Sequence, residues 1–296
     1  MKVAFIINPI SGKKAKGAYR RDRVDAFIES RKLDAVSWET ERAGHAVELA
    51  ERALDEKVDR VVCVGGDGTI NEVAKGLINS NVSFAFVPMG SGNGLARHLN
   101  IPLDFDEALE NSIDGEILEM DTGSANGKPF FNVMGLGLDA EIGKRFNETK
   151  TRGFITYLGE GFKTITSYRS SMYSIKGAGH SESLTAKIIA VANSSQYGSD
   201  AFIAPGASVC DGRLNLVAIG KPNFLGLVDL FRRLFGKSIY GSKFVTTIVA
   251  EKFMIGLKGP SFFHVDGEIY ECGDSLEIEA IPRSLRILVP SKESTI

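Results

Sequence analysis

The sequence has few cysteines and none of the spacings that would give them a structural task. Three cysteines occur in 296 residues, Cys63, Cys210 and Cys272, and no Cys-x-x-Cys pair is present. An odd count of widely spaced cysteines argues against both a disulfide framework and a zinc site. We therefore expect a protein of a reducing, cytoplasmic compartment.

The chain also lacks an excess of charge and a long apolar run. Its 35 basic and 37 acidic residues give a formal net charge of −2, so no global field attracts nucleic acid, and we expect no nucleic-acid partner. The first apolar run, Val3 to Ile7, is too short for a signal peptide or a membrane span. We expect any membrane contact to be peripheral, at the inner face, and the sequence leaves a homodimer open.

What is present is a glycine-rich stretch from Val61 to Glu72. Residues 61–64 are an apolar run that predicts a buried strand, and Gly65, Gly66 and Gly68 interrupt it before helix-forming residues follow. Glycines let backbone N–H groups approach an anion, and the positive end of a helix favours the same anion. Thr69 and Glu72 have the spacing of a capping box, which predicts that Thr69 caps the helix. Asp67 would repel phosphate unless a cation lies between them, which predicts magnesium–nucleotide binding.

Two common nucleotide motifs are absent, namely the Walker A pattern and the spaced glycine fingerprint of dinucleotide-binding sheets. An ordinary strand-turn-helix junction is the plain alternative. The complete eight-residue motif Gly65 to Glu72, however, resembles the nucleotide motif of the diacylglycerol kinase catalytic domain family. This family includes bacterial lipid kinases, sphingosine kinases and ceramide kinases. Its Gly-Gly-Asp-Gly core is also similar to NAD kinases.

Strands and helices alternate up to about residue 122. A strand at 82–87 leads into a second glycine loop, Pro88 to Arg97, and alternation of this kind predicts a parallel, doubly wound α/β domain with ligands at the carboxyl ends of its strands. The second loop resembles a family segment, except that Gly94 stands where many diacylglycerol kinases have aspartate. That feature is closer to the sphingoid and ceramide branch. The resemblance implies that ATP binds through Asn8, Thr40, Gly65, Gly66, Asp67, Gly68, Thr69, Ile70, Asn71, Glu72 and Ser91.

From residue 123 to 284 short strand-like segments prevail, which predicts a mainly β domain. The family resemblance implies that this domain shapes the site of the lipid acceptor and that a cleft lies between the two domains. The strand at 285–289 is expected to return, with the rest of 285–296, to the nucleotide-binding domain of residues 1–122. Gly135 to Ala140 formally fits a dinucleotide pattern, but it lies outside a βαβ series, and its resemblance to a family segment makes Asp139 a candidate on the acceptor side. Residues 147–173 are expected to be helical in places, with an apolar stripe.

Two later turns carry oxygen-rich side chains. The turn at Asp211-Gly212 is a place where short oxygen ligands can surround a hard cation. In the family a similar segment holds a magnesium ion, which by position implies Ser208, Asp211 and the carbonyl of Arg213. The turn at Asp266-Gly267-Glu268 follows an apolar strand and is either a plain hairpin or a catalytic segment.

The resemblance assigns the base to Glu268, with Asp266 and Asp67 in support, because a carboxylate can take the proton of an attacking hydroxyl.

One helix is predicted to be strongly amphipathic. Residues 223–237 combine a broad apolar face with Arg232, Arg233 and Lys237, a composition that suits an anionic membrane surface but equally suits a helix that covers the β domain.

The sequence as a whole predicts a magnesium- and ATP-dependent lipid kinase acting at a membrane surface. The alternatives are an NAD kinase-like enzyme and a nucleotide-binding regulator without turnover.

Overall fold

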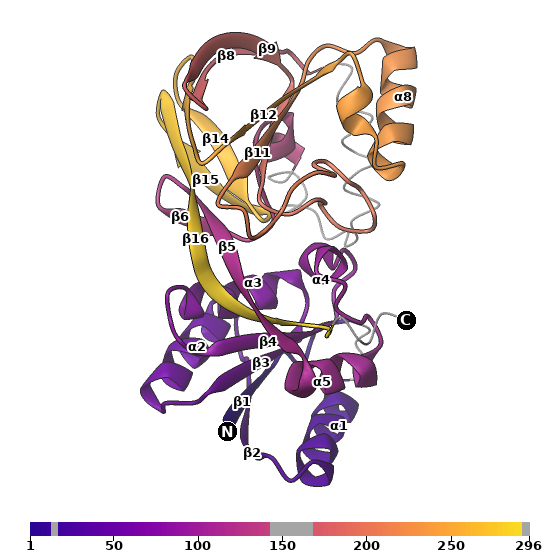
Figure 1. The fold of residues 1–296 in the computed structure, drawn as a ribbon, viewed down its shortest axis with the longest axis vertical. Coiled ribbons are helices and arrows are strands. Elements are labelled where there is room, and N and C mark those ends of the chain that lie inside the picture. The colour runs from indigo at the N-terminus through magenta and orange to yellow at the C-terminus, as the bar shows by residue number, and fades with distance from the viewer. Residues whose placement is uncertain (13–16, 143–167, 292–296) are drawn as a thin grey trace. The chain divides into compact units, whose positions relative to one another are not determined.

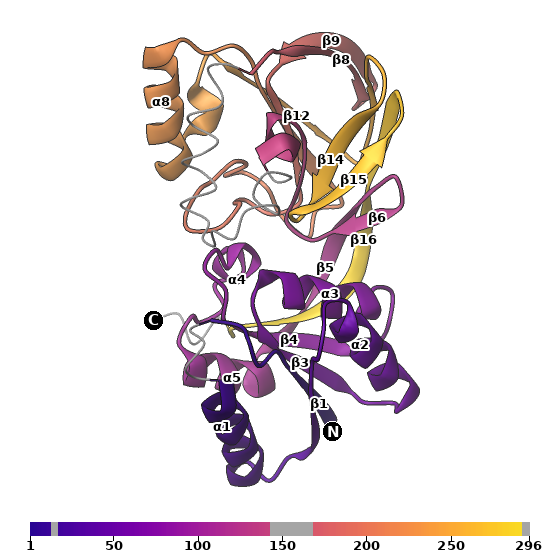
Figure 2. The same ribbon diagram turned by 180° about the vertical axis from the view of Figure 1, so that it is seen from behind.

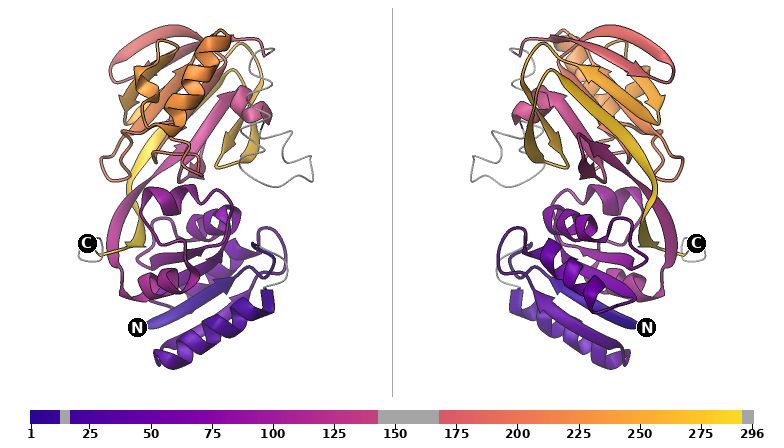
Figure 3. Two further views of the ribbon diagram at one scale, coloured as in Figure 1. Left: turned by 90° about the vertical axis from the view of Figure 1, so that its right-hand side faces the viewer. Right: turned by 90° about the vertical axis from the view of Figure 1, so that its left-hand side faces the viewer.

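The computed structural model describes residues 1–12, 17–142 and 168–291. The chain divides into two compact units, which are drawn in Figure 1. The first unit comprises Met1–Met120 together with Arg283–Ile296, and the second comprises Asp121–Pro282. The strands β5 (Glu116–Ala125) and β16 (Ser275–Val289) each contribute residues to both units and pair with each other, as Figure 3 shows.

A parallel sheet forms the centre of the first unit. Its strands are β1 (Lys2–Ile7), β2 (Asp34–Glu39), β3 (Arg60–Gly65) and β4 (Ser83–Pro88), which lie side by side in the order β2-β1-β3-β4. These strands are short and mostly buried because both faces of the sheet are covered, which explains their nearly continuous apolar runs. The end of β16 adds a further parallel strand beside β4, with Ile287 opposite Phe84.

Helices cover both faces of this sheet. The helices α1 (Gly17–Ser30) and α5 (Phe105–Asp114) pack on the face that carries Phe5, Val62 and Val87. The helices α2 (His45–Asp55) and α3 (Asp67–Leu77) pack against each other and contact β1 and β3. A short helix, α4 (Gly94–His98), follows β4. The expected parallel α/β architecture of the first domain is confirmed.

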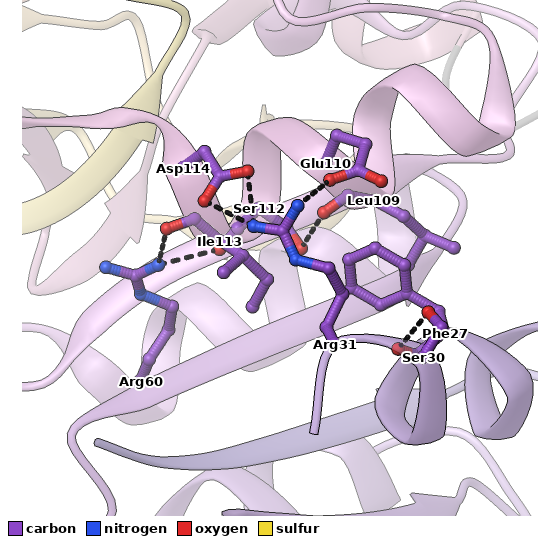
Figure 4. A network of polar contacts seen from close by, with 9 residues as sticks. All are labelled: Phe27, Ser30, Arg31, Arg60, Leu109, Glu110, Ser112, Ile113 and Asp114. Atoms are coloured by element: carbon purple, nitrogen blue, oxygen red, sulfur yellow. Dashed lines mark hydrogen bonds and ion pairs between the residues drawn. The ribbon is translucent and has the colours of Figure 1, made fainter. Parts of the chain in front are cut away.

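Arginines fix the end of α5 against its neighbours (Figure 4). Arg60, buried at the start of β3, donates from Nη1 to the carbonyl oxygens of Ser112 at 3.0 Å and Ile113 at 2.6 Å. Arg31, just after α1, pairs with Glu110 at 2.8 Å and Asp114 at 2.6 Å. The last carbonyls of a helix have no partner within the helix, so Arg60 satisfies groups that burial would otherwise leave unbonded.

The second unit is built from antiparallel strands. One sheet has the order β12-β11-β10-β7-β14-β15. A second group of strands belongs to the larger sheet, in which the start of β16 pairs with β13, β13 with β8 and β8 with β9, while β6 pairs with β5. The bounds are β6 (Lys128–Phe130), β7 (Val133–Gly137), β8 (Ser171–Gly177), β9 (His180–Ala186), β10 (Ile188–Ala192), β11 (Leu214–Ile219), β12 (Val245–Ala250), β13 (Lys252–Gly256), β14 (Ser261–Val265) and β15 (Glu268–Cys272).

Apolar clusters on both faces of the β7-containing sheet hold the second unit together. The larger one joins the two sheets, with Leu136 and Phe263 of one sheet packed in the same cluster as Phe253 and Ile278 of the other. A second cluster lies on the opposite face of the β7-containing sheet and includes Leu230 of α8 (Phe224–Phe235) and Ile239 of the 3-10 helix η2 (Ile239–Gly241). The helix α8 is labelled in Figure 2. The expected mainly β character of the second domain is confirmed.

Several local expectations differ from the structure. The prediction that Thr69 caps the helix in a capping box is wrong, because α3 begins at Asp67 after Gly66 and Thr69 lies inside its first turn. The sequence predicts one strand over residues 184–192, but the structure divides this segment between β9 and β10, where the buried Lys187 donates its N–H to the carbonyl of Ile219. The last residues of the segment 147–173, which was expected to be helical in places, belong to strand β8, and residues 143–167, with the predicted apolar stripe, lie outside the described residues. Lys13, Lys14 and Lys16, which the sequence predicts in a basic helix after the turn at Asn8, also lie outside the described residues.

Candidate functional site

The sequence-predicted nucleotide residues of the first unit gather at one edge of its sheet. Asn8 follows β1, Thr40 follows β2, Gly66 follows β3 and Ser91 lies shortly after β4. Thr40 donates its N–H to the carbonyl of Ile7 at 2.9 Å, and Asn8 donates its N–H to the carbonyl of Val64 at 2.9 Å. The parallel sheet therefore brings together four loops that are far apart in the sequence, at the edge where such sheets bind ligands.

The loop after β1 is bonded to the first turn of α3. Asn8 donates from Nδ2 to Thr69 Oγ1 at 2.7 Å, and its Oδ1 accepts the N–H of Ile10 at 3.0 Å. Ser11 Oγ accepts the N–H of Gly66 at 3.1 Å. Thr69 thus binds this loop, which explains why a threonine stands there although it does not cap the helix. The loop 8–12 is placed beside a helix N-terminus whose partial positive charge suits a phosphate.

Asp67 connects the two glycine loops. Its Oδ2 accepts the N–H of Asn93 and its Oδ1 accepts the N–H of Gly94, both at 3.2 Å. A side chain on Gly90 would overlap the same carboxylate, so the second loop can approach Asp67 only with glycine there. The motif predicts a cation at Asp67 but does not indicate these two amide donors, because they lie 26 and 27 residues further along the chain.

The remaining members of the motif differ in exposure. Thr69, Ile70 and Asn71 are buried on the inner face of α3, while Gly68 and Ser91 are exposed. Glu72 accepts the N–H of Ala46, in the first turn of α2, at 3.3 Å. Ile70 therefore serves the core, Glu72 links α2 to α3, and the outward-facing part of the motif is its glycine turn.

In the second unit the Asp266-Gly267 turn joins β14 to β15. Both residues have positive φ, 48° and 91°, which is the geometry of a tight Asp-Gly hairpin. Asp266 accepts the N–H groups of Phe131, Asn132 and Val133 at 2.7, 3.0 and 3.0 Å. Burial raises the pKa of Asp266, and the three N–H donors act against that rise. These bonds make Asp266 the anchor of the turn.

Glu268 is the first residue of β15 and is half-buried. Its Oε2 accepts the hydroxyl proton of Tyr270 at 2.6 Å. Burial and then the Glu268 carboxylate raise the pKa of Tyr270 to about 12, so the phenol stays a donor at neutral pH. The pairing of the hairpin thus positions the backbone of Glu268, and the bond from Tyr270 positions its carboxylate.

The loop 208–213 has oxygen atoms turned toward its own amides. Ser208 Oγ accepts the N–H of Cys210 at 3.3 Å, Asp211 Oδ1 accepts the N–H of Arg213 at 3.0 Å, and the buried Asp121 accepts the N–H of Gly212 at 2.7 Å. Burial and the charges of Asp121 and Asp211 raise the pKa of Cys210, so both carboxylates act on the same loop. Sequence reasoning missed Asp121, because nothing in its strand marks it.

The chemistry of the loop 208–213 with Asp121 suits a hard cation, since two carboxylates and a hydroxyl are available. Across residues 1–12, 17–142 and 168–291 no group of three His, Cys, Asp or Glu side chains is arranged to hold a metal ion, so backbone oxygens would have to complete any such site.

Asp139, predicted on the acceptor side, is buried. Its carboxylate accepts the hydroxyl proton of Tyr197 at 2.7 Å and lies 3.2 Å from Nε2 of the buried His264.

Two family models match the chain. The model for a diacylglycerol kinase catalytic domain matches residues 2–125, and the model for a YegS C-terminal NAD kinase beta sandwich-like domain matches residues 132–289. A diacylglycerol kinase of Staphylococcus aureus (strain JH9) is 28% identical over 235 residues, which cover 76% of this chain and 73% of that protein. The protein from strain Newman gives the same values.

A crystal structure of a diacylglycerol kinase from Bacillus anthracis str. Sterne shares the fold, with a TM-score of 0.76, 21% identity and coverage of 97% of this chain and 96% of that one.

Proposed function

Because the chain belongs to the family that joins a diacylglycerol kinase catalytic domain to a YegS C-terminal NAD kinase beta sandwich-like domain, we propose that it is a lipid kinase. In this proposal it transfers the γ-phosphoryl group of magnesium–ATP to a lipid hydroxyl. The observation that carries it is the arrangement around α3, where loops after four strands meet at a helix N-terminus and Asp67 joins the two glycine loops.

ATP would bind to the first unit through its phosphates. The backbone N–H groups of the glycine turn and the dipole of α3 offer positive charge, and the loop 8–12 is bonded to that same turn. Phosphoryl transfer needs little covalent chemistry from the protein, so positioning and charge stabilisation supply most of the acceleration. Asn8, Thr40, Ser91 and residues 65–72 are the proposed nucleotide residues.

Glu268 is the proposed base in the second unit. A carboxylate within hydrogen-bond reach of a lipid hydroxyl can accept its proton as the new O–P bond forms, and ADP leaves. Tyr270 and the hairpin restrict where this carboxylate lies. Asp266 supports Glu268 through the backbone, by anchoring the turn that precedes it.

Magnesium is proposed at two places in the protein. Asp67 would hold the nucleotide's metal while retaining its amide donors, and Ser208, Asp211 and the Arg213 carbonyl, with Asp121 added by the structure, would hold a second ion that supports the loop. When bound, the nucleotide's metal supplies neutralisation of phosphate charge.

The experiment that tests the proposal is transfer from labelled ATP, with magnesium, to a panel of acceptors. The panel contains diacylglycerol, monoacylglycerol, a sphingoid base, ceramide, phosphatidylglycerol and NAD. We expect label in a lipid product, with diacylglycerol first because the curated relatives carry that name, and a sphingoid base second because Gly94 follows Asn93. Label in NAD alone would favour the NAD kinase-like alternative, and nucleotide binding without transfer would favour a regulator.

The helix α8 is the proposed contact with the membrane that contains the lipid. Its inner residues Leu227 and Leu230 are buried in the second unit, yet Phe224 and Leu225 are 72% and 75% exposed, and Val228, Phe231 and Phe235 are also exposed. Arg232 and Arg233 share Asp229 at 3.1 and 2.6 Å, so with Lys237 the helix keeps a positive balance. An apolar face beside positive charge suits an anionic bilayer.

Within the described parts of the chain, no helix is both long and apolar enough to cross a membrane. Peripheral adsorption is therefore the form of contact to test, with phosphatidylglycerol vesicles at low salt. Leu225→Ser should weaken binding, and Leu103→Ser, an exposed leucine of the first unit, should not. Replacing Arg232 and Arg233 by glutamine should weaken the free energy of vesicle binding by about 1 kcal/mol per lost charge. If the wild-type protein does not bind these vesicles, the membrane contact is refuted and α8 serves only to cover the β sheet.

A further inference from the structure

A buried histidine and a buried aspartate form a couple beneath the hairpin that carries Glu268. His264 lies on β14 and Asp139 lies in the helical segment 138–142 that directly follows β7. Both side chains are 5% exposed, and Nε2 of His264 lies 3.2 Å from Oδ2 of Asp139. Tyr197 donates its hydroxyl proton to the same Oδ2 at 2.7 Å. A buried carboxylate needs a donor such as the Tyr197 hydroxyl, because burial without one is costly, whereas Nε2 of His264 makes no hydrogen bond and contributes by its proximity.

The strand register explains how the two side chains meet. His264 is directly opposite Gly135 in the antiparallel pair β14 and β7. Opposite residues direct their side chains to the same face of a sheet, so a side chain at 135 would occupy the space between the strands there. A Cβ on Gly135 would overlap both the His264 ring and the Asp139 carboxylate. The glycine thus leaves the room that the couple fills.

The other ring nitrogen of His264 faces the turn. Its Nδ1 accepts the N–H of Gly267, at a donor to acceptor distance of 3.4 Å. An accepting Nδ1 leaves the ring proton of neutral histidine on Nε2, which is the nitrogen beside Asp139. Gly267 is the residue directly before Glu268, and Val265 pairs with Glu268 to close the hairpin. Asp266 is bonded on the opposite side to the N–H groups of residues 131–133.

We propose that His264 is a positioning residue for Glu268. Tyr197 holds the Asp139 carboxylate, whose Oδ2 lies 3.2 Å from Nε2 of the imidazole without a hydrogen bond of good geometry, and Nδ1 of the imidazole accepts the Gly267 N–H just before the start of β15. The inference rests on the proposed function in one respect, namely that Glu268 is the base. It matters because a displacement of about 1 Å can cost a reaction roughly 10²-fold, even when the altered residue touches no reactant.

Two substitutions of His264 separate its two contacts. In His264→Asn, the side-chain oxygen takes the place of Nδ1 and can still accept the Gly267 N–H, but the contact with Asp139 is lost. In His264→Gln, the terminal amide reaches the place of Nε2 and can still meet Asp139, but the acceptor for Gly267 is lost. We expect kcat to fall about 10- to 100-fold in His264→Gln and by no more than about threefold in His264→Asn. The KM for ATP should stay constant in both, because the proposed nucleotide residues belong to the other unit.

Hydrogen exchange at the Gly267 amide supplies a readout that needs no turnover. The amide should be protected in the wild type and in His264→Asn, and should exchange faster in His264→Gln. If His264→Gln does not fold, Asp139→Asn serves instead, with intermediate protection and an intermediate kcat expected.

Equal exchange of the Gly267 amide in all proteins, or equal kcat losses in the two His264 variants, would overturn the positioning role. A wild type without transfer to any acceptor would overturn the proposed function instead, and the exchange result would still decide the role of His264.

Discussion

Asp67 shows how one carboxylate can serve both the loops and a ligand. It accepts the amides of Asn93 and Gly94, and it is also the proposed contact to the nucleotide's magnesium. We expect Asp67→Ala to abolish turnover and to weaken magnesium–ATP binding far more than metal-free ADP binding, as measured by calorimetry. Equal losses for both ligands would mean that the carboxylate acts only by holding the second loop.

Glu268 offers a cleaner separation of chemistry from structure. Glu268→Gln keeps an oxygen that can accept from Tyr270 but cannot take a proton, so the protein should fold, bind ATP normally and lose roughly 10²–10⁴-fold in turnover. A smaller loss is chemically reasonable where the proton moves late in a loose transition state. Glu271→Gln, an exposed residue of the same strand, is the matched control. Wild-type turnover in Glu268→Gln would transfer the role of base to Asp266 or Asp67.

Tyr173 gives a prediction about pH. It is 4% exposed in the core of the second unit, and burial raises its pKa to about 12. The folded protein thus favours the protonated phenol more than the unfolded chain does, so this contribution to stability is complete below about pH 10 and is lost as pH rises toward 12. Stability to urea should fall by about 2 kcal/mol across that window, and Tyr173→Phe should reduce the decline. An unchanged decline would show that other groups cause it.

At the scale of elements, the loop 208–213 is the part whose stability depends on a ligand. A metal that binds only the folded loop stabilises the protein by mass action, so magnesium should raise the melting temperature of the wild type. Asp211→Ala should lower the melting temperature and remove that magnesium response, while Asp274→Ala, on an exposed turn of the same unit, should leave the response intact. A full magnesium response in Asp211→Ala would remove the metal from this loop.

Elements also explain which local predictions succeeded. The strands β1, β3 and β4 were predictable because short apolar runs closed by turn residues have few alternatives. The start of α3 was not, because the bond between Asn8 and Thr69 joins residues 61 positions apart and competes with the local capping pattern. For α8 the amphipathic pattern was predictable, but only the fold decides that Leu230 is buried and Phe231 exposed.

At the scale of the whole molecule, the end of the chain is part of the first unit. Leu285, Ile287 and Leu288 of β16 are fully buried, and Ser284 accepts the N–H of Asn79 at 2.7 Å. We expect Leu288→Ala to destabilise the first unit by about 2–5 kcal/mol through the lost contacts and the cavity left behind. The single tryptophan, Trp38 on β2, reports the unfolding of that unit by fluorescence. A change under about 1 kcal/mol would show that β16 contributes little there.

The kind of fold, the order of the elements and the short motifs that carry the family resemblance could be read from the amino-acid sequence, because they depend on periodicity and on turn chemistry within a few residues. Which polar groups meet became known from the folded chain alone. The joining of the glycine loops by Asp67, the anchoring of Asp266 on residues 131–133 and the couple of His264 and Asp139 all join residues 26 or more positions apart. The physical reason is that strand pairing sets such contacts, and pairing partners leave no local signal in the chain.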